Sequence, residues 1–123
     1  MIDIVEYISQ NYGGKIVEVG VGHFFAISDW LEKMGFEVAR TDLKKTRHDV
    51  MVDDICNPDY EIYKGAELII SVRPPMEIQG CILRLGKKIG CDVMIVPLKN
   101  EITGGGRLVN YRRVSFYVFT PQS

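Results

Sequence analysis

The sequence has little of what marks membrane-spanning or strongly charged proteins. Its longest apolar runs are short, and one of the longest, residues 66–72, contains Glu67, whereas about 20 apolar residues are needed to cross a bilayer. Fifteen Lys and Arg residues balance 16 Asp and Glu residues, which leaves a net charge of -1. No overall basic field therefore exists to hold nucleic acid or an anionic membrane surface. We expect a soluble protein with neither a membrane nor a nucleic-acid partner.

Cysteine and histidine are too few, and too badly spaced, for a metal site. Cys56, Cys81 and Cys91 form no C-x-x-C pair, and His23 and His48 have no acid or cysteine at ligand spacing. We therefore expect no metal. Nothing at the N-terminus has the pattern of a signal peptide. An odd number of cysteines without such a peptide predicts a cytoplasmic protein whose thiols are reduced.

Several catalytic motifs are also absent, namely G-x-S-x-G, the P-loop and paired catalytic carboxylates. What is present is a composition close to the globular average, with 46% apolar and 25% charged residues. A chain of 123 residues is too short for a cofactor domain plus a substrate domain. We expect residues 1–123 to form a single domain.

Short β-branched runs alternate with segments of helical periodicity along the chain. Strands are expected at 15–19, 36–42, 50–52, 67–72 and 92–96. Helices are expected at 2–12, around 27–34, from Asn57-Pro58 onward and from Pro74-Pro75 to Ile89. This alternation predicts a three-layer α/β fold with a mostly parallel, doubly wound sheet of order 3-2-1-4-5. Residues 107–119 should return as an antiparallel edge.

Such sheets bind ligands at the carboxyl ends of their strands, where the strand order reverses. Glu18 is near the end of the first strand, and Gly20 and Gly22 follow the strand, which allows a tight turn and close approach of a ligand. The second strand ends at Asp42, whose carboxylate can accept hydrogen bonds from a ribose diol. The alternative is an ordinary turn in which Asp42 is a solvated residue.

Glu18 favours S-adenosylmethionine over NAD as the nucleotide. A carboxylate at this strand end would repel the pyrophosphate of a dinucleotide but attract the ammonium group of S-adenosylmethionine. The dinucleotide fingerprint also requires a small residue where Phe25 stands. We expect S-adenosylmethionine as the cofactor, with NAD as the alternative.

The third and fourth strands end in charged residues. Asp53 or Asp54 could accept a hydrogen bond from an adenine amino group; two adjacent acids do not easily turn the same way, and which one faces the ligand stays open. Arg73 precedes a helix start at Pro75, an arrangement that suits a carboxylate or phosphate. Alternatively, Arg73 pairs with Asp54 or Glu77 and only holds the loop.

The remaining candidates are less specific. His23 or Glu77 could act as a base, and the glycine-rich loop after the fifth strand, residues 98–106, could close over a ligand or be a flexible turn. The basic clusters at 44–48 and 112–113 are typical of solvated faces.

Five segments of the chain resemble a small, uncharacterised archaeal protein family with a Rossmann-like fold. They are KIVEVGVG (15–22), TD (41–42), VDDICNP (52–58), YKGAELIISVRPPME (63–77) and VPL (96–98). More widely, Glu18, Gly20 and Gly22 are similar to the first motif of class I methyltransferases, an acidic residue followed by x-G-x-G-x-G, with Phe24 in place of the third glycine. The resemblance implies a methyltransferase-like fold.

The stretch around Pro74-Pro75 departs from one branch of these enzymes. Amino-group methyltransferases place Asp or Asn before Pro-Pro and an aromatic residue after it, where this chain has Arg73 and Met76. A cation there would repel the positive charge that develops on a methylated nitrogen. An anionic small acceptor fits better.

Two functions remain open. In the first, Glu18, Gly20, Gly22, Asp42 and one of the Asp53/Asp54 pair hold S-adenosylmethionine for methyl transfer to an acceptor oriented by Arg73. In the second, the protein is a non-catalytic nucleotide-binding sensor or assembly module, because the chain has no appended segment to select an acceptor. Either would take a small nucleotide-type ligand, and a homo-oligomer is compatible with both.

Overall fold

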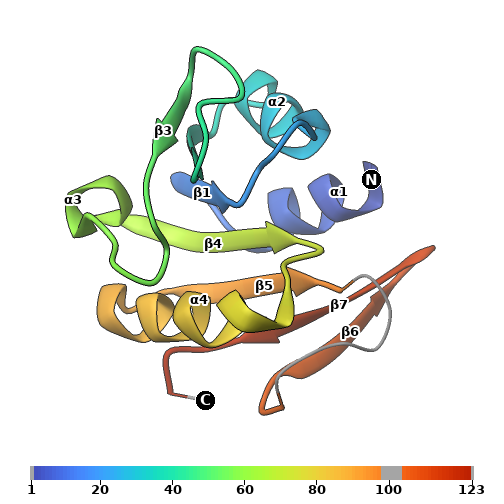
Figure 1. Ribbon diagram of the computed structural model, residues 1–123. Coiled ribbons are helices and arrows are strands. Elements are labelled where there is room, and N and C mark those ends of the chain that lie inside the picture. Colours follow the sequence, from blue (N-terminus) through green and yellow to red (C-terminus); the bar gives the residue numbers. More distant parts are fainter. Residues whose placement is uncertain (1, 98–103, 123) are drawn as a thin grey trace.

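The computed structural model describes residues 2–97 and 104–122, in which strands of one sheet alternate with helices (Figure 1). The helices are α1 (Ile2–Asn11), α2 (Ala26–Lys33), α3 (Tyr60–Tyr63) and α4 (Met76–Ile89). The strands are β1 (Lys15–Val19), β2 (Glu37–Asp42), β3 (Val50–Val52), β4 (Ala66–Val72), β5 (Asp92–Val96), β6 (Arg107–Tyr111) and β7 (Val114–Phe119). In this part of the chain the sheet has seven strands, in the order β3-β2-β1-β4-β5-β7-β6.

The five strands from β3 to β5 are parallel, whereas β7 runs antiparallel to β5 and pairs with β6 as a hairpin. The strand order reverses between β1 and β4, which are neighbours in the sheet. The α/β class, the order 3-2-1-4-5 and the antiparallel C-terminal edge are therefore confirmed.

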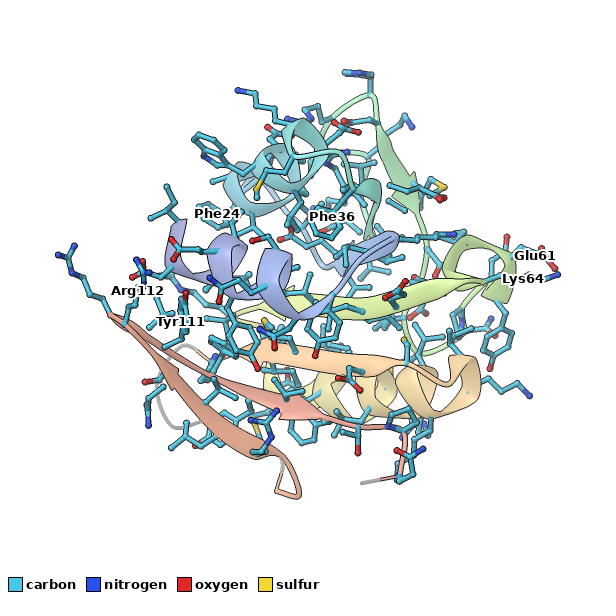
Figure 2. The ribbon with its side chains drawn as sticks, turned by 180° about the vertical axis from the view of Figure 1, so that it is seen from behind. Phe24, Phe36, Glu61, Lys64, Tyr111 and Arg112 are labelled. Carbon is cyan, nitrogen blue, oxygen red and sulfur yellow. A yellow bond between two sulfur atoms is a disulfide. The ribbon has the colours of Figure 1, made fainter. Side chains whose placement is uncertain are left out.

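Helices cover both faces of the sheet, and each face has its own apolar core. On one face, Ile4 and Ile8 of α1 and Leu31 of α2 pack against strand residues such as Ile16. Figure 2 shows α1 lying in front of the sheet on this side. On the other face, Tyr63 of α3 and residues of α4 pack against Val17 and other strand residues. Because successive strand residues point to opposite faces, neighbours such as residues 16 and 17 serve different cores.

Helix ends follow local chemistry. Gly90 ends α4 in a left-handed conformation, with φ of 84°, and its N–H donates to the carbonyl of Gly86. The prediction that α3 begins at Asn57-Pro58 is wrong. The helix begins at Tyr60, because the carboxylate of Asp59 accepts the N–H of Glu61 and caps it.

The β6–β7 hairpin is fastened to the first helix. The hydroxyl of Tyr111 donates to the Glu6 carboxylate at 3.0 Å, and the Arg112 guanidinium forms an ion pair with the same group at 2.6 Å. Figure 2 shows Tyr111 and Arg112 together at the tip of the hairpin beside α1. These contacts join the two ends of the sequence.

The prediction that all thiols are reduced is wrong for two of the cysteines. Cys56, in the segment between β3 and α3, forms a disulfide with Cys81 of α4. The segment runs beside α4, and the two Cα atoms are 5.0 Å apart, within the range that a disulfide spans. Cys91 is a buried free thiol. The expectation of a cytoplasmic protein therefore loses the support that it drew from the cysteines.

Within residues 2–97 and 104–122, the longest helix, α4, has 14 residues, and no helix there is suited to spanning a membrane.

Candidate functional site

A cavity of about 260 Å³ lies where the parallel strands β1 to β4 end. Its lining residues come from the ends of β1 and β2, from the segment after β3 and from the start of α4. They are Val19, Gly20, Thr41, Asp42, Leu43, Asp53, Asp54, Ile55, Pro75 and Ile78. The cavity therefore lies at the reversal of the strand order, where doubly wound sheets bind ligands.

The turn after β1 uses both predicted glycines. Gly20 and Gly22 have φ of 64° and 55°, a left-handed conformation that residues with a side chain adopt only with strain. The N–H between them, of Val21, donates to the carbonyl of Thr41 at the end of β2. Of the two glycines, Gly20 borders the cavity and Gly22 lies further along the turn. A bare backbone is thus presented to the cavity.

Asp42 connects this turn to the end of β2. One carboxylate oxygen, Oδ2, accepts the Gly22 N–H at 2.8 Å, and the other, Oδ1, accepts the Lys44 N–H at 3.0 Å. A carboxylate has about four lone-pair sites, so each oxygen can accept a further hydrogen bond. Asp42 is therefore held in one orientation at the cavity wall.

Both members of the Asp53/Asp54 pair border the cavity, although their partners differ. Asp53 accepts hydrogen bonds from the Tyr63 hydroxyl at 2.6 Å and from the Asp59 N–H at 3.0 Å. Asp54 uses Oδ1 to accept the Cys56 N–H at 2.9 Å. The segment between β3 and α3 bends sharply after the strand, which is how adjacent residues reach the same wall.

Glu18 does not line the cavity. It points to the opposite face of the sheet from Val19 and is 2% exposed, beneath α2. Burial raises its pKa to about 8, although hydrogen bonding to Ser28 and the charge of Arg40 favour the ionised form. Its Oε1 has no hydrogen-bond partner among the described residues. Successive side chains of a strand point to opposite faces of the sheet. This alternation along β1 could have shown from the sequence that Glu18 points away from the cavity.

Arg40 is a buried charged residue that sequence reasoning missed. It lies opposite Glu18 in the paired strands, and its side chain is 2% exposed. The guanidinium contacts Asp29 at 2.9 Å, Glu32 at 3.2 Å and Asp49 at 3.3 Å. A cation in the middle of an expected strand, with acids on the preceding and following segments, was the available signal.

The basic cluster at 44–48 is only partly a solvated face. Arg47 pairs with Asp29 at 2.7 Å and with Asp49 at 2.8 Å, and it stacks 3.9 Å from the centre of the Phe25 ring. These hydrogen bonds lower the pKa of Asp49 to about 2. Phe25 is thereby held beside α2, and neither it nor Phe24 lines the cavity.

The three candidate catalytic residues are exposed and do not line the cavity. His23 follows the glycine turn, Glu77 is in the first turn of α4, and Arg73 is between β4 and α4. Arg73 has φ of 54°, and its N–H donates to the carbonyl of Val96 at 2.7 Å. Residues 98–103, the main part of the loop expected to close over a ligand, lie outside the described residues. Among the residues described, no three His, Cys, Asp or Glu side chains are grouped as metal ligands.

Solved methyltransferase structures have a similar fold. Magnesium protoporphyrin IX methyltransferase from Synechocystis PCC 6803, with bound SAM, has a TM-score of 0.62 and 12% identity, covering 95% of this chain and 74% of that chain. The Pyrococcus abyssi tRNA (uracil-54, C5)-methyltransferase, in complex with S-adenosyl-L-homocysteine, has a TM-score of 0.66 and 14% identity, covering 95% of this chain and 36% of that chain. At such identities the similarity establishes the fold, which is Rossmann-like and methyltransferase-like.

Sequence relatives match over nearly the whole chain. The UPF0146 protein of Archaeoglobus fulgidus is 42% identical over 122 residues, which are 96% of this chain and 93% of that protein. The UPF0146 protein of Methanothermobacter thermautotrophicus is 40% identical over 123 residues, covering 95% and 92%. The model of the uncharacterised protein family UPF0146 matches residues 1–120. The resemblance noted in the sequence is confirmed, and the chain belongs to this UPF0146 family of archaeal proteins.

Proposed function

We propose that this protein binds S-adenosylmethionine at the ends of β1 to β4 and transfers its methyl group to a small anionic acceptor. The observation that carries the proposal is the cavity at the reversal of the strand order, bordered by the backbone of Gly20 and the carboxylate of Asp42. Methyltransferases of similar fold have been solved with SAM or S-adenosyl-L-homocysteine bound.

The cavity suits the adenosine half of the cofactor. Its volume of about 260 Å³ is just below the range of roughly 300–1,000 Å³ of ligand pockets. Val19, Ile55 and Ile78 provide apolar walls for a base. Asp42, already oriented by two backbone N–H groups, would accept the ribose hydroxyls. The methionine half would then lie over the turn at Gly20.

Asp54 fits the adenine amino group better than Asp53 does. Asp53 is half-buried and accepts from both the Tyr63 hydroxyl and the Asp59 N–H, so its main contacts support the wall. Asp54 engages Oδ1 with the Cys56 N–H, which leaves Oδ2 to accept from the ligand. Glu18, buried under α2, is not assigned a contact with the cofactor.

Arg73 is the residue that would orient the acceptor. It is exposed at the start of the loop that leads to Pro75, which borders the cavity, and it forms no ion pair with any described residue. Methyl transfer depends mainly on how the two reactants are positioned. A guanidinium that binds the carboxylate or phosphate of the acceptor would therefore contribute much of the catalysis by orienting it.

One observation favours a second function, a nucleotide-binding module without catalysis. Arg73, Glu77 and His23 all lie outside the cavity lining, so none of the three faces a bound adenosine group directly. In this alternative the ligand, S-adenosylmethionine or NAD, would act as a signal rather than as a substrate.

Calorimetric titration with S-adenosylmethionine, S-adenosylhomocysteine, NAD and NADP tests the binding. We expect the first two to bind, and Asp42→Asn to weaken them by about tenfold to a hundredfold, because hydrogen bonds to a charged group contribute about 1.5–3 kcal/mol. Glu37→Gln, at the opposite end of β2, is the matched control and should leave the affinity unchanged. Ile78→Trp, which fills the cavity from α4, should abolish binding.

The outcomes separate the candidates. Binding of the dinucleotides alone would replace S-adenosylmethionine with NAD. Binding of S-adenosylmethionine without transfer of a labelled methyl group to small carboxylates or phosphate esters would favour the module. If no compound binds, or if binding survives both Asp42→Asn and Ile78→Trp, the cavity is not the site.

A further inference from the structure

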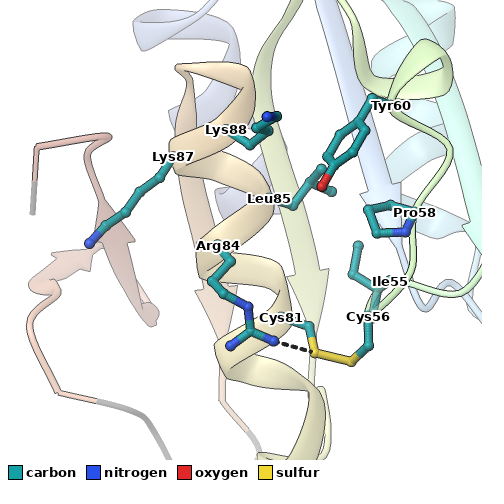
Figure 3. A pocket seen from close by; sticks show the side chains of 9 residues that line it. All are labelled: Ile55, Cys56, Pro58, Tyr60, Cys81, Arg84, Leu85, Lys87 and Lys88. Carbon is teal, nitrogen blue, oxygen red and sulfur yellow. Dashed lines mark hydrogen bonds between the residues drawn. A yellow bond between two sulfur atoms is a disulfide. The ribbon is translucent and has the colours of Figure 1, made fainter.

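A second and larger hollow, of about 480 Å³, lies beside α4 and adjoins the first cavity at Ile55. It is enclosed by α4 and by the segment from Ile55 to Tyr60 (Figure 3). Its lining residues are Ile55, Cys56, Pro58, Tyr60, Cys81, Arg84, Leu85, Lys87 and Lys88. The Cys56–Cys81 disulfide forms part of its wall.

The charged side chains that line this hollow are cations, and the nearby Asp54 carboxylate, which borders the other cavity, accepts the N–H of Cys56. The lining of the hollow includes Arg84, Lys87 and Lys88 and no carboxylate, whereas Glu61 borders the adjoining hollow together with Lys88. Figure 3 shows Arg84 turned toward the disulfide and Lys88 toward Tyr60, with Lys87 directed away. The Lys88 ammonium group lies 5.5 Å from the centre of the Tyr60 ring. Such a lining favours a ligand that carries a negative charge.

The two sulfur atoms of the disulfide are not equivalent. Cys56 is exposed, whereas Cys81 is 8% exposed. The Arg84 guanidinium donates a hydrogen bond to the Sγ of Cys81 at 3.1 Å. An incoming thiolate therefore reaches Cys56 more easily, and a cation is already placed beside the sulfur that would leave.

We propose that this hollow is a thiol–disulfide exchange site for a small thiol that carries an anionic group, such as a carboxylate, sulfonate or phosphate. The anionic group lies near Arg84 and Lys88, and the thiolate attacks the Sγ of Cys56. A bond forms between the sulfur of the small thiol and the Sγ of Cys56 while the Cys56–Cys81 bond breaks. The electron pair of the broken bond stays on Cys81, whose thiolate is stabilised by Arg84.

A second small thiolate then attacks the mixed disulfide and releases Cys56. In total two small thiols are oxidised to one small disulfide, and the protein disulfide is reduced to two thiols. The two protons given up by the small thiols end on the two protein cysteines. The proposal does not rest on S-adenosylmethionine binding.

The test measures how fast thiols of matched size but different charge reduce the folded, oxidised protein. The probes are 2-mercaptoethanesulfonate, which is anionic, 2-mercaptoethanol, which is neutral, and cysteamine, which is cationic. Rates are followed by intact mass after acid quenching, and each rate is compared between protein variants, so the intrinsic reactivity of each thiol cancels.

Arg84→Gln should slow the anionic thiol about fivefold or more, through loss of both ligand attraction and thiolate stabilisation, and should slow the neutral thiol less. Lys88→Gln should slow the anionic thiol alone. Lys33→Gln, on α2, is the matched control and should change none of the rates. High salt should lower the reduction rate of the anionic thiol relative to that of the neutral thiol, because salt screens the attraction to Arg84 and Lys88.

The reverse step locates the attacked sulfur: Cys81→Ser is incubated with the symmetric disulfide of 2-mercaptoethanesulfonate, and peptide mapping should find one 2-mercaptoethanesulfonate joined to Cys56 while the other leaves as a thiol. The proposal is overturned if the folded protein resists all three thiols, which would make the disulfide a purely structural crosslink. It is also overturned if Arg84→Gln and Lys88→Gln slow all three thiols equally. The same holds if the disulfide of 2-mercaptoethanesulfonate modifies Cys81 in the Cys56→Ser variant but does not modify Cys56 in Cys81→Ser.

Discussion

The buried carboxyl of Glu18 should make the stability of this protein depend on pH. Burial raises its pKa from an ordinary value of 4.5 to about 8. Between these two values the folded protein keeps a proton on Glu18 that the unfolded chain has lost. Folding therefore takes up a proton in this interval, and the free energy of unfolding falls as the pH rises.

The size of the effect follows from the shift. Each unit between the two pKa values corresponds to about 1.4 kcal/mol, so the full interval is worth on the order of 5 kcal/mol as an upper limit. Glu18→Gln keeps the shape and removes the titration. At about pH 5 the variant and the parent should differ little, and at about pH 9 the variant should be more stable by roughly 2–4 kcal/mol.

Urea unfolding of both proteins across this pH range is the appropriate assay, because all other titrating groups are common to both and cancel in the difference. Glu37→Gln, an exposed glutamate on β2, is the control and should show no pH-dependent difference. A difference between Glu18→Gln and the parent that stays constant with pH would show that Glu18 is ionised in the folded protein, with Arg40 compensating its charge.

Two further substitutions test the packing and the buried cation. Gly86→Ala would place a Cβ at 2.3 Å from the Cγ2 of Val93 and should lower the free energy of unfolding by about 1–3 kcal/mol. Gly80→Ala in the same helix makes only ordinary contacts and should raise the free energy of unfolding by up to about 1 kcal/mol. Equal melting temperatures of the two variants would contradict the packing of α4 on β5. Arg40→Met should cost roughly 1–3 kcal/mol in urea unfolding because it leaves the surrounding acids without their buried partner, and a variant as stable as the parent would show that Arg47 alone compensates them.

Much of the fold could be predicted from the sequence because local patterns and topology agree. Buried β-branched runs such as residues 15–19 alternate with amphipathic helices, and short connections between them allow few parallel arrangements. The start of α3 was misplaced by two residues because Asn57-Pro58 and Asp59 offer competing caps, and only the tertiary path of the chain selects one.

The candidate site was predictable where it depends on strand ends alone. Gly20, Asp42 and the Asp53/Asp54 pair meet because the carboxyl ends of parallel strands lie at one edge of the sheet. Glu18 was grouped with them by its place in the sequence, whereas alternation within β1 turns it to the opposite face.

For two features the sequence does not identify which residues are partners. The disulfide joins residues 25 apart, and its pairing depends on how the segment after β3 runs beside α4. The ion pairs of Arg40 bring together residues of α2, β2 and the loop before β3. Both need the assembled fold before the partners can be identified.

The disulfide also constrains how the cavity at the strand ends can change shape. Cys56 directly follows Ile55 and Cys81 is one helical turn after Ile78, so the bridge joins the two sides that these apolar residues provide. With the bridge intact, those sides cannot separate, and any widening must come from Leu43 and the glycine turn across from them. Cutting the bridge would free the segment after β3 to swing outward as a flap, carrying Asp54 with it.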